Sequence, residues 1–284
     1  MKYAIVNDHI INREEAKVDI EDRGYQFGDG VYEVIRVYNG KMFTVKEHME
    51  RFVRSAESIG IKIPYASENI TKMLEDLIEK DNLKLGIVYM QITRGAAPRN
   101  HAFPSGDVVP VITAYTKEMP IPEANLQSGV KTILTEDIRW LRCDIKSLNL
   151  LGNILAKQKA AEQGCYEAIQ HRGQDVTEGS SSNVYIVKNG TVITHESNNL
   201  ILKGITKDVI LKVCAENEIP VEERTFSLEE LAQADEVFLS STTSEVTPIV
   251  VIDEKKVGTG SPGPITKKLQ ALFKQEIENQ CGII

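Results

Sequence analysis

Two Asn-Gly pairs constrain the fold of this chain most, because each stands between two segments with the character of β-strands. Residues 31–38 alternate in polarity, Asn39-Gly40 follows, and residues 42–45 resume the apolar pattern. Asn189-Gly190 separates residues 184–188 from residues 191–194 in the same way. Asn-Gly favours the tight turn of a two-residue hairpin. The sequence therefore predicts antiparallel hairpins in both halves of the chain.

Helices and further strands are expected around these hairpins. Helical periodicity and length predict helices over residues 46–59, 67–79, 153–163, 206–217 and 264–278, with a short one after Ser227. Strands are expected near residues 3–11, 85–94, 108–115, 130–136, 166–171, 236–240 and 249–253. Residues 117–125 carry two prolines and little periodicity, which predicts a linker. Since strands and helices do not alternate as regular βαβ units, we expect an α+β protein of two domains, residues 1–119 and 120–284.

Charge and apolar content exclude several classes of function. The formal net charge of −8 argues against a nucleic-acid partner, which requires a basic face. No apolar run approaches the length of a membrane helix, and the N-terminal residues lack the apolar core of a signal peptide, so a cytoplasmic protein is expected. The cysteines at 143, 165, 214 and 281 show no CxxC spacing, and no metal site is expected.

Lys146 and Glu178 are the sharpest candidates for chemistry. Lys146 lies in Asp144-Ile-Lys-Ser-Leu-Asn149, and Glu178 leads into Gly-Ser-Ser-Ser-Asn183. A pyridoxal phosphate site uses a lysine amine to hold the cofactor covalently and a carboxylate to keep the ring nitrogen protonated. Taken one motif at a time, an exposed lysine and a solvated turn are the alternatives.

Three further segments could bind a phosphate group. Gly204-Ile-Thr206 precedes a predicted helix, whose free amides suit an anion, although a plain Thr N-cap is the alternative. The hydroxyl cluster of residues 240–244 follows an apolar strand. Arg51 lies off the apolar stripe of its helix, where a surface arginine is the usual explanation and a phosphate contact the functional one.

The loop from Arg94 to Phe103 places Arg99 and His101 after a predicted strand, and such a loop could clamp a substrate carboxylate. An exposed loop with two polar residues is the alternative. The glycines of residues 24–30 lack the spacing of a nucleotide-binding loop, and they more plausibly shape a turn that aims Tyr32 and Glu33.

Joined in order, these segments resemble the fold-type IV family of pyridoxal phosphate enzymes nearly end to end. The motifs that carry the resemblance are Arg23-Gly-Tyr-Gln-Phe-Gly-Asp-Gly-Val-Tyr-Glu33, Asp144-Ile-Lys-Ser-Leu-Asn149, Thr177-Glu-Gly-Ser-Ser-Ser-Asn183, Leu202-Lys-Gly-Ile-Thr206 and Ser241-Thr-Thr-Ser-Glu245. Within that family the sequence is most similar to the bacterial D-amino acid aminotransferases, the loop from Arg94 to Phe103 included.

The resemblance implies a role for each candidate residue. Lys146 holds the cofactor and carries a proton between the substrate α carbon and the cofactor C4′. Glu178 pairs with the ring nitrogen. The implied phosphate contacts are Arg51, Ile205, Thr206, Ser241 and Thr242. Tyr32, Arg99 and His101 resemble the family's carboxylate trap, the last two contributed by the neighbouring subunit of a homodimer. The side chains of Ser180, Ser181, Ser182 and Leu202 would line the site near the ring. The cofactor would lie at the interface of the two domains.

The implied activity is transamination of D-amino acids, with D-alanine and 2-oxoglutarate giving pyruvate and D-glutamate and a broad range of D-amino acids accepted. A branched-chain L-amino acid aminotransferase and an aminodeoxychorismate lyase share the cofactor motifs and are the alternatives within the family. We expect those rivals to lack the pairing of Arg99 with His101. A non-catalytic binding protein of the same fold is a further alternative, but it would have no need of Lys146.

Overall fold

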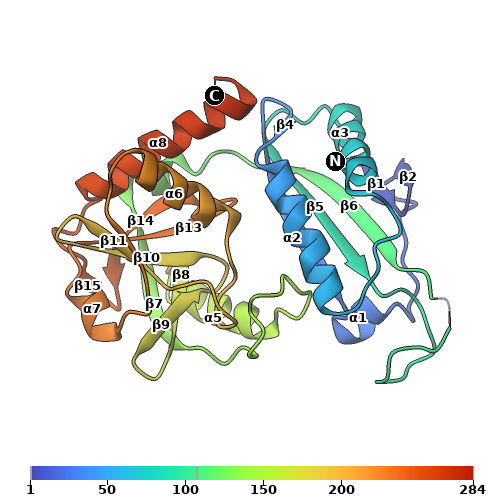
Figure 1. Ribbon diagram of the computed structural model, residues 1–284, viewed down its shortest axis with the longest axis horizontal. Coiled ribbons are helices and arrows are strands. Elements are labelled where there is room, and N and C mark those ends of the chain that lie inside the picture. Colours follow the sequence, from blue (N-terminus) through green and yellow to red (C-terminus); the bar gives the residue numbers. More distant parts are fainter. Residues whose placement is uncertain (1, 107, 284) are drawn as a thin grey trace. The chain divides into compact units, whose positions relative to one another are not determined.

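The computed structural model describes residues 2–106 and 108–283, which form two compact units (Figure 1). Unit 1 comprises Met1–Pro120, Ile145–Asn149 and Ile277–Ile284, and unit 2 comprises Ile121–Asp144 and Leu150–Glu276. Each unit combines one sheet with helices and has an apolar core of its own, so the expected α+β class is confirmed. The short segment that carries Lys146 thus belongs to unit 1, although the chain on both sides of it belongs to unit 2.

Unit 1 contains a six-stranded antiparallel sheet in the order β2-β1-β6-β5-β3-β4. Its strands are β1 (Tyr3–Val6), β2 (His9–Asn12), β3 (Gly30–Tyr38), β4 (Lys41–Met42), β5 (Gly86–Thr93) and β6 (Val111–Glu118). The hairpin predicted at Asn39-Gly40 is confirmed, because Tyr38 pairs with Lys41 across it. Both turn residues have positive φ, as a type I′ turn requires.

The helices of unit 1 are α1 (Arg23–Phe27), α2 (Val45–Ser58) and α3 (Ser67–Lys80). α2 and α3 cover one face of the sheet (Figure 1), and the apolar stripe of α2 packs there against Ile35 and Val37 of β3. Side chains alternate along a strand, so Tyr32 lies on the opposite face of the sheet. The glycine-rich turn expected before β3 contains a short helix, α1, capped by the Asp22 side chain and ended by Gly28 in the left-handed conformation.

Unit 2 contains a nine-stranded mixed sheet, with the order β12-β11-β10-β13-β14-β7-β8-β9 and with β15 paired to β14. Its strands are β7 (Val130–Glu136), β8 (Glu167–Arg172), β9 (Asp175–Gly179), β10 (Asn183–Lys188), β11 (Thr191–Thr194), β12 (Val221–Glu223), β13 (Glu236–Ser241), β14 (Glu245–Ile252) and β15 (Lys255–Lys256). The hairpin predicted at Asn189-Gly190 is confirmed by the pairing of Lys188 with Thr191. β9, which ends at the site described below, was not predicted.

The helices of unit 2 are α4 (Glu123–Ser128), α5 (Leu151–Glu162), α6 (Ile205–Glu216), α7 (Leu228–Ala232) and most of α8 (Pro264–Cys281). The segment predicted as a linker includes the end of β6 and the beginning of α4. Within residues 2–106 and 108–283, no helix combines the length and the apolar character needed to cross a membrane.

Candidate active site

Lys146 is fixed by backbone pairing to β3 within unit 1. The Tyr32 amide donates to the Lys146 carbonyl at 3.0 Å, and the Leu148 amide donates to the Gly30 carbonyl at 2.9 Å. The Lys146 amide in turn donates to the hydroxyl of Ser55 on α2, at 3.3 Å. The half-buried amine lies 4.3 Å from the centre of the Tyr32 ring. The fold therefore brings together Lys146 and Tyr32, two residues that the sequence separates by more than a hundred positions.

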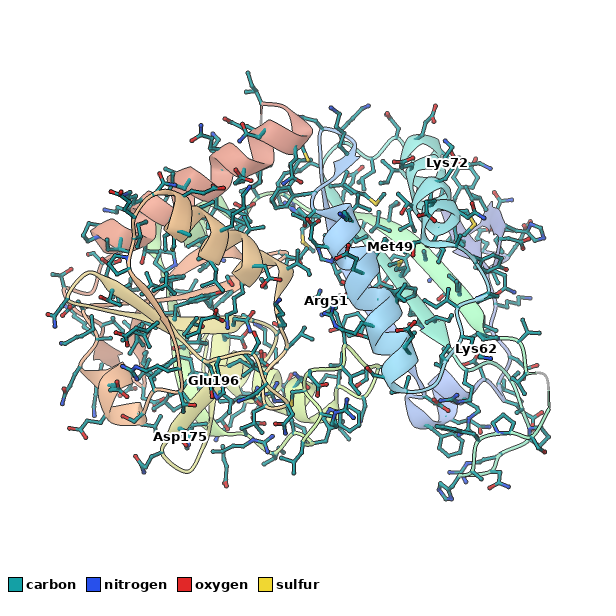
Figure 2. The ribbon with its side chains drawn as sticks, viewed as in Figure 1. Met49, Arg51, Lys62, Lys72, Asp175 and Glu196 are labelled. Atoms are coloured by element: carbon teal, nitrogen blue, oxygen red, sulfur yellow. The ribbon has the colours of Figure 1, made fainter. Side chains whose placement is uncertain are left out.

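Arg51 is buried, and its guanidinium is held by a carboxylate. On α2 (Figure 2), its guanidinium donates from Nε to Oε1 of Glu33 at 2.7 Å and from Nη2 to Oε2 at 2.9 Å. His48 Nδ1 contacts the same Oε2 at 2.7 Å. Burial raises the pKa of Glu33, but the Arg51 charge and hydrogen bonds outweigh it and hold that pKa well below its usual range. The helical pattern alone favours a surface position for Arg51, and that prediction is wrong. Sequence reasoning assigned no role to Glu33 and His48, the other members of this cluster.

Glu178 lies at the end of β9 in unit 2, and every hydrogen-bond partner of its carboxylate is an N–H group. Arg139 Nη1 donates to its Oε1, Asn183 Nδ2 donates to its Oε2 at 3.0 Å, and the Leu202 amide lies 3.1 and 3.2 Å from the two oxygens. Burial raises the pKa of Glu178 above its usual value, and the Arg139 charge and hydrogen bond oppose that rise without cancelling it. An ionised carboxylate can accept from all of these groups, whereas a protonated one would bring an extra proton among donors. The hydrogen-bond partners of Glu178 therefore suit the ionised form.

Arg139 is itself held by a second carboxylate behind Glu178. Asp137 accepts from Nε of Arg139 at 2.9 Å and from Nη2 at 2.8 Å, and it also accepts from Arg172 at 3.1 Å and from Thr177 at 3.0 Å. Burial raises the pKa of Asp137, but these partners hold it far below its usual range. Arg139, Asp137 and Asn183 were missed as functional residues, because nothing in their local sequence distinguishes them from surface polar residues.

The loop of Ser180, Ser181 and Ser182 is organised by the buried carboxylate of Glu167. All three hydroxyls donate to this side chain, two of them at 3.2 Å. The amides of Ala168 and Ser180 also donate to Glu167, at 2.8 and 3.2 Å. Because each serine gives its only hydroxyl proton to Glu167, its oxygen is left as an acceptor. Glu167 is a further residue to which sequence reasoning assigned no role.

Replacement of Glu167 by Gln is expected to destabilise unit 2. The amide nitrogen would face hydroxyl donors in place of an acceptor oxygen, and leaving buried groups unpaired costs about 2 kcal/mol. We expect the thermal midpoint to fall by about 4–8 °C. Glu162→Gln, at an exposed carboxylate near the end of α5, is the matched control and should leave the midpoint unchanged. Equal midpoints for the two variants would contradict the role given to Glu167.

The candidate phosphate residues of unit 2 lie on α6 and at the end of β13, two elements that pack against each other. α6 begins at Ile205 after Gly204, and no side chain caps its first turn, so the amides there remain available to an anion. A Cβ added to Gly204 would lie 2.1 Å from Oδ1 of Asn183, so this close approach requires glycine. Ser241 ends β13 and Thr242 begins the turn after it, which the Ser241 hydroxyl stabilises by accepting from the Ser244 amide at 3.0 Å.

Arg99 and His101 are exposed on the loop between β5 and β6 of unit 1. Both lie against Phe27 of α1, with the Arg99 guanidinium 4.9 Å and the His101 ring 5.7 Å from the centre of its ring. The fold thus groups the predicted site residues in two sets. Unit 1 carries Tyr32, Arg51, Lys146, Arg99 and His101, and unit 2 carries Glu178, Ser180, Ser181, Ser182, Leu202, Ile205, Thr206, Ser241 and Thr242.

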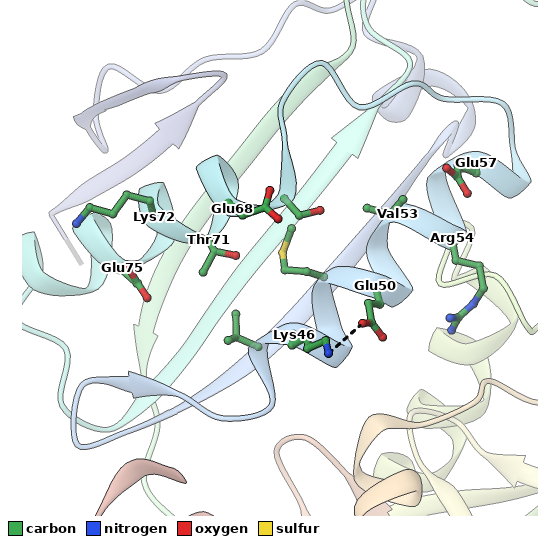
Figure 3. A pocket seen from close by; sticks show the side chains of 12 residues that line it. Lys46, Glu50, Val53, Arg54, Glu57, Glu68, Thr71, Lys72 and Glu75 are labelled. Carbon is green, nitrogen blue, oxygen red and sulfur yellow. Dashed lines mark ion pairs between the residues drawn. The ribbon is translucent and has the colours of Figure 1, made fainter.

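A groove of about 670 Å³ lies elsewhere in unit 1, between α2 and α3 (Figure 3). Its floor includes Met49 and Val53, and its rim carries the ion pair of Lys46 and Glu50 at 4.0 Å. None of the candidate site residues lines this groove, so it is separate from the site.

The chain is similar to known proteins over nearly its whole length. Residues 30–252 match the family described as Amino-transferase class IV. The chain is 51% identical to the D-alanine aminotransferase of Staphylococcus haemolyticus, over 99% of this chain and 100% of that protein. It is 54% identical to the D-alanine aminotransferase of Listeria monocytogenes serotype 1/2a (strain 10403S), over 98% of this chain and 97% of that protein.

Solved structures of similar fold include branched-chain aminotransferases. The Escherichia coli enzyme matches with a TM-score of 0.91 and 28% identity, over 97% of this chain and 95% of that one. The enzyme of Thermobaculum terrenum, solved in its PLP form, matches with a TM-score of 0.87 and 28% identity, over 98% of this chain and 94% of that one. The architecture expected of a fold-type IV enzyme is confirmed, and the chain belongs to the class IV aminotransferase family.

Proposed function

We propose that this protein is a pyridoxal phosphate-dependent transaminase of D-amino acids, which converts D-alanine and 2-oxoglutarate to pyruvate and D-glutamate and accepts other D-amino acids. The observation that carries the proposal is the identity of 51–54% to D-alanine aminotransferases along nearly the whole chain, against 28% to the branched-chain enzymes of similar fold. A branched-chain L-amino acid aminotransferase is the second candidate, because those enzymes share the fold over almost the full length.

The residues of the two units suit this cofactor chemically. Glu178 offers a buried carboxylate whose partners are all donors, which is the group a protonated ring nitrogen requires. The uncapped start of α6 supplies amides for a phosphate, with the hydroxyls of Ser241 and Thr242 on the neighbouring strand and turn. When bound, pyridoxal phosphate supplies a ring that takes up the electron pair released as the substrate α proton leaves. We propose that the two sets of residues serve one cofactor.

Each residue then has a defined task. Lys146 would be the covalent anchor, and its freed amine would move the proton between the substrate α carbon and the cofactor C4′. Glu178 keeps the ring nitrogen protonated, and Arg139 keeps Glu178 ionised. The phosphate is held by Arg51, Ile205, Thr206, Ser241 and Thr242. Glu33 keeps the Arg51 guanidinium in one orientation, since it accepts two hydrogen bonds from it.

Substrate recognition falls to Tyr32, Arg99 and His101, which bind the carboxylate of the amino acid. The serine loop and Leu202 line the site near the ring. We propose that Arg99 and His101 act in the site of the neighbouring subunit. Handedness would follow from the fixed positions of two groups, the Lys146 amine on one side of the α carbon and the carboxylate clamp on the other.

An exposed apolar surface on unit 2 supports the homodimer. The side chains of Leu151, Ile154 and Leu155 form one stripe of α5, and Ile138 and Leu141 lie in the segment before it. These five are between 51% and 66% exposed. Large apolar side chains gathered in this way are typical of an interface. We also place the protein in the cytoplasm, and its four free cysteines suit a reducing compartment.

The activity is tested by offering D-alanine or L-alanine with 2-oxoglutarate to the cofactor-loaded protein and measuring pyruvate. We expect turnover of the D form and less than about 1% of that rate with the L form, which corresponds to a difference of roughly 3 kcal/mol between the two transition states. Preference for L-leucine over D-alanine would overturn the proposal in favour of a branched-chain aminotransferase. Release of pyruvate from aminodeoxychorismate, without turnover of D-alanine, would instead identify the lyase.

A further inference from the structure

The loop that carries Arg99 and His101 has little regular secondary structure between β5 and β6, yet it makes specific contacts with α1. We propose that Arg23, Phe27 and Asp29 are positioning residues that set this loop for substrate recognition. The proposal rests on the proposed function, because it takes Arg99 and His101 as the carboxylate clamp. It gives a purpose to residues 23–29 of the glycine-rich motif, to which the cofactor chemistry assigns none.

Asp29 joins the two arginines at the base of the loop. Its carboxylate accepts from Nε of Arg23 at 2.7 Å and from Nε and Nη2 of Arg94 at 2.9 and 3.0 Å. Arg94 also donates to the carbonyls of Ile59 and Gly60, at 2.7 and 3.2 Å. Burial raises the pKa of Asp29, but hydrogen bonds from the two arginines lower it below its usual value. The charges of this cluster are therefore satisfied within unit 1.

Arg23 connects the cluster to the backbone around His101. Its Nη1 donates to the Asn100 carbonyl at 2.6 Å and lies 3.5 Å from the Ala102 carbonyl, and these carbonyls belong to the residues before and after His101. The Arg23 amide also donates to the Gly95 carbonyl at 3.0 Å. The backbone amide of Arg23 therefore holds the beginning of the loop, and its buried side chain holds the middle.

Phe27 provides a common surface for the two clamp residues. The guanidinium of Arg99 lies 4.9 Å from the centre of the Phe27 ring, and that of Arg23 lies 4.8 Å from it. The His101 ring packs against the same ring in a tilted arrangement, with centres 5.7 Å apart. Cation–π contacts of this kind favour one position of a flexible side chain over the many that an exposed arginine samples.

The consequence concerns substrate binding rather than chemistry. An arginine on an unrestrained loop must be ordered when the substrate binds, and that entropy is lost from the affinity. A loop ordered in advance by α1 avoids this cost. Loss of the Phe27 ring should therefore raise KM for the amino acid and leave kcat nearly unchanged, because Lys146 and Glu178 are not part of the cluster.

The test compares holoenzyme carrying Phe27→Leu, Arg99→Ala, or both. We expect Phe27→Leu to raise KM for D-alanine by about tenfold, with kcat within about twofold of the parent. The double variant should raise KM by less than the product of the two single effects, since the ring acts partly through Arg99. Additive effects, or an unchanged KM in Phe27→Leu, would overturn the proposal.

A second measurement reads the order of the loop without activity. Trypsin cleaves after Arg99, and mass spectrometry of the fragments gives the rate of that cut in the holoenzyme. Phe27→Leu should accelerate cleavage at Arg99 by about tenfold, because proteolysis follows the population of locally opened chain. Equal rates in parent and variant would show that the ring does not order the loop.

Tyr25→Leu is the matched control on the same helix. The Tyr25 ring is 78% exposed and has no ring contact among the residues that the structure describes. This variant should leave both KM and the cleavage rate unchanged. If the parent protein fails to use D-alanine, the proposed function is wrong, while the cleavage rate at Arg99 still decides whether α1 positions the loop.

Discussion

Replacement of Lys146 by Ala is expected to lower kcat for D-alanine by about four orders of magnitude, because the variant loses both the covalent anchor and the group that moves the α proton. The structure fixes the segment that carries this amine. Lys146 is held at both backbone groups, and its amine stands over the Tyr32 ring at 4.3 Å. Stopped-flow measurement of the first half-reaction with D-alanine reads this loss directly.

Chemical trapping gives an independent measurement of the same residue. Borohydride treatment of the parent holoenzyme should add the mass of the reduced cofactor to the peptide that contains Lys146, and the Lys146→Ala protein should gain no such mass. Lys84→Ala, at an exposed lysine of the same unit, is the control and should behave as the parent does. Label on a different lysine of the parent protein would remove Lys146 from its assigned role.

The fold was predictable where the signal is local. Asn39-Gly40 and Asn189-Gly190 specify their hairpins by themselves, because positive φ at both turn residues is a property of those two residues. The helices α2 and α3 follow from apolar periodicity, since each buries one face against the sheet. α1 has only five residues, too few to show a period, and the sequence therefore suggested only a turn there.

The site was predictable only through resemblance, because its decisive contacts join distant residues. Arg139 and Glu178 meet through the arrangement of strands in unit 2, and 39 positions separate them. Arg51 looks like a surface arginine on its own helix, and its burial depends on Glu33 on a different element. Periodicity describes which face of an element is apolar, but it carries no information about which polar side chain of another element will lie opposite.

Lys146 illustrates the same limit. Its segment leaves unit 2, pairs with β3 of unit 1 through a few residues, and returns. No local sequence pattern predicts that this segment belongs to unit 1, since Ile145–Asn149 is too short to show the periodicity of a strand. The predicted domain boundary near residue 120 therefore places Lys146 in the second domain, whereas the structure assigns its segment to unit 1.

Replacement of Glu178 by Gln is expected to lower kcat by about two to three orders of magnitude while the protein stays folded. The neutral amide cannot hold a proton on the ring nitrogen, so the group that takes up the released electron pair is weakened. The substitution also leaves the Arg139 guanidinium with Asp137 as its remaining carboxylate partner, which costs stability of about 1–3 kcal/mol. Because Asp137 still accepts two hydrogen bonds from Arg139, we expect folding to survive.

Two measurements separate these effects. The rate of the half-reaction with D-alanine reports the chemical role of the carboxylate, and the thermal midpoint of the protein without cofactor reports the stability of the ion pair. Asn183→Ala is the matched variant, because it removes a donor at 3.0 Å from Glu178 but keeps the carboxylate and its pairing with Arg139. It should lower the half-reaction rate by less than Glu178→Gln does, because the carboxylate remains and only one hydrogen bond to it, worth about 1.5–3 kcal/mol, is lost. A Glu178→Gln protein that keeps the parent rate would show that the buried carboxylate serves only to pair Arg139.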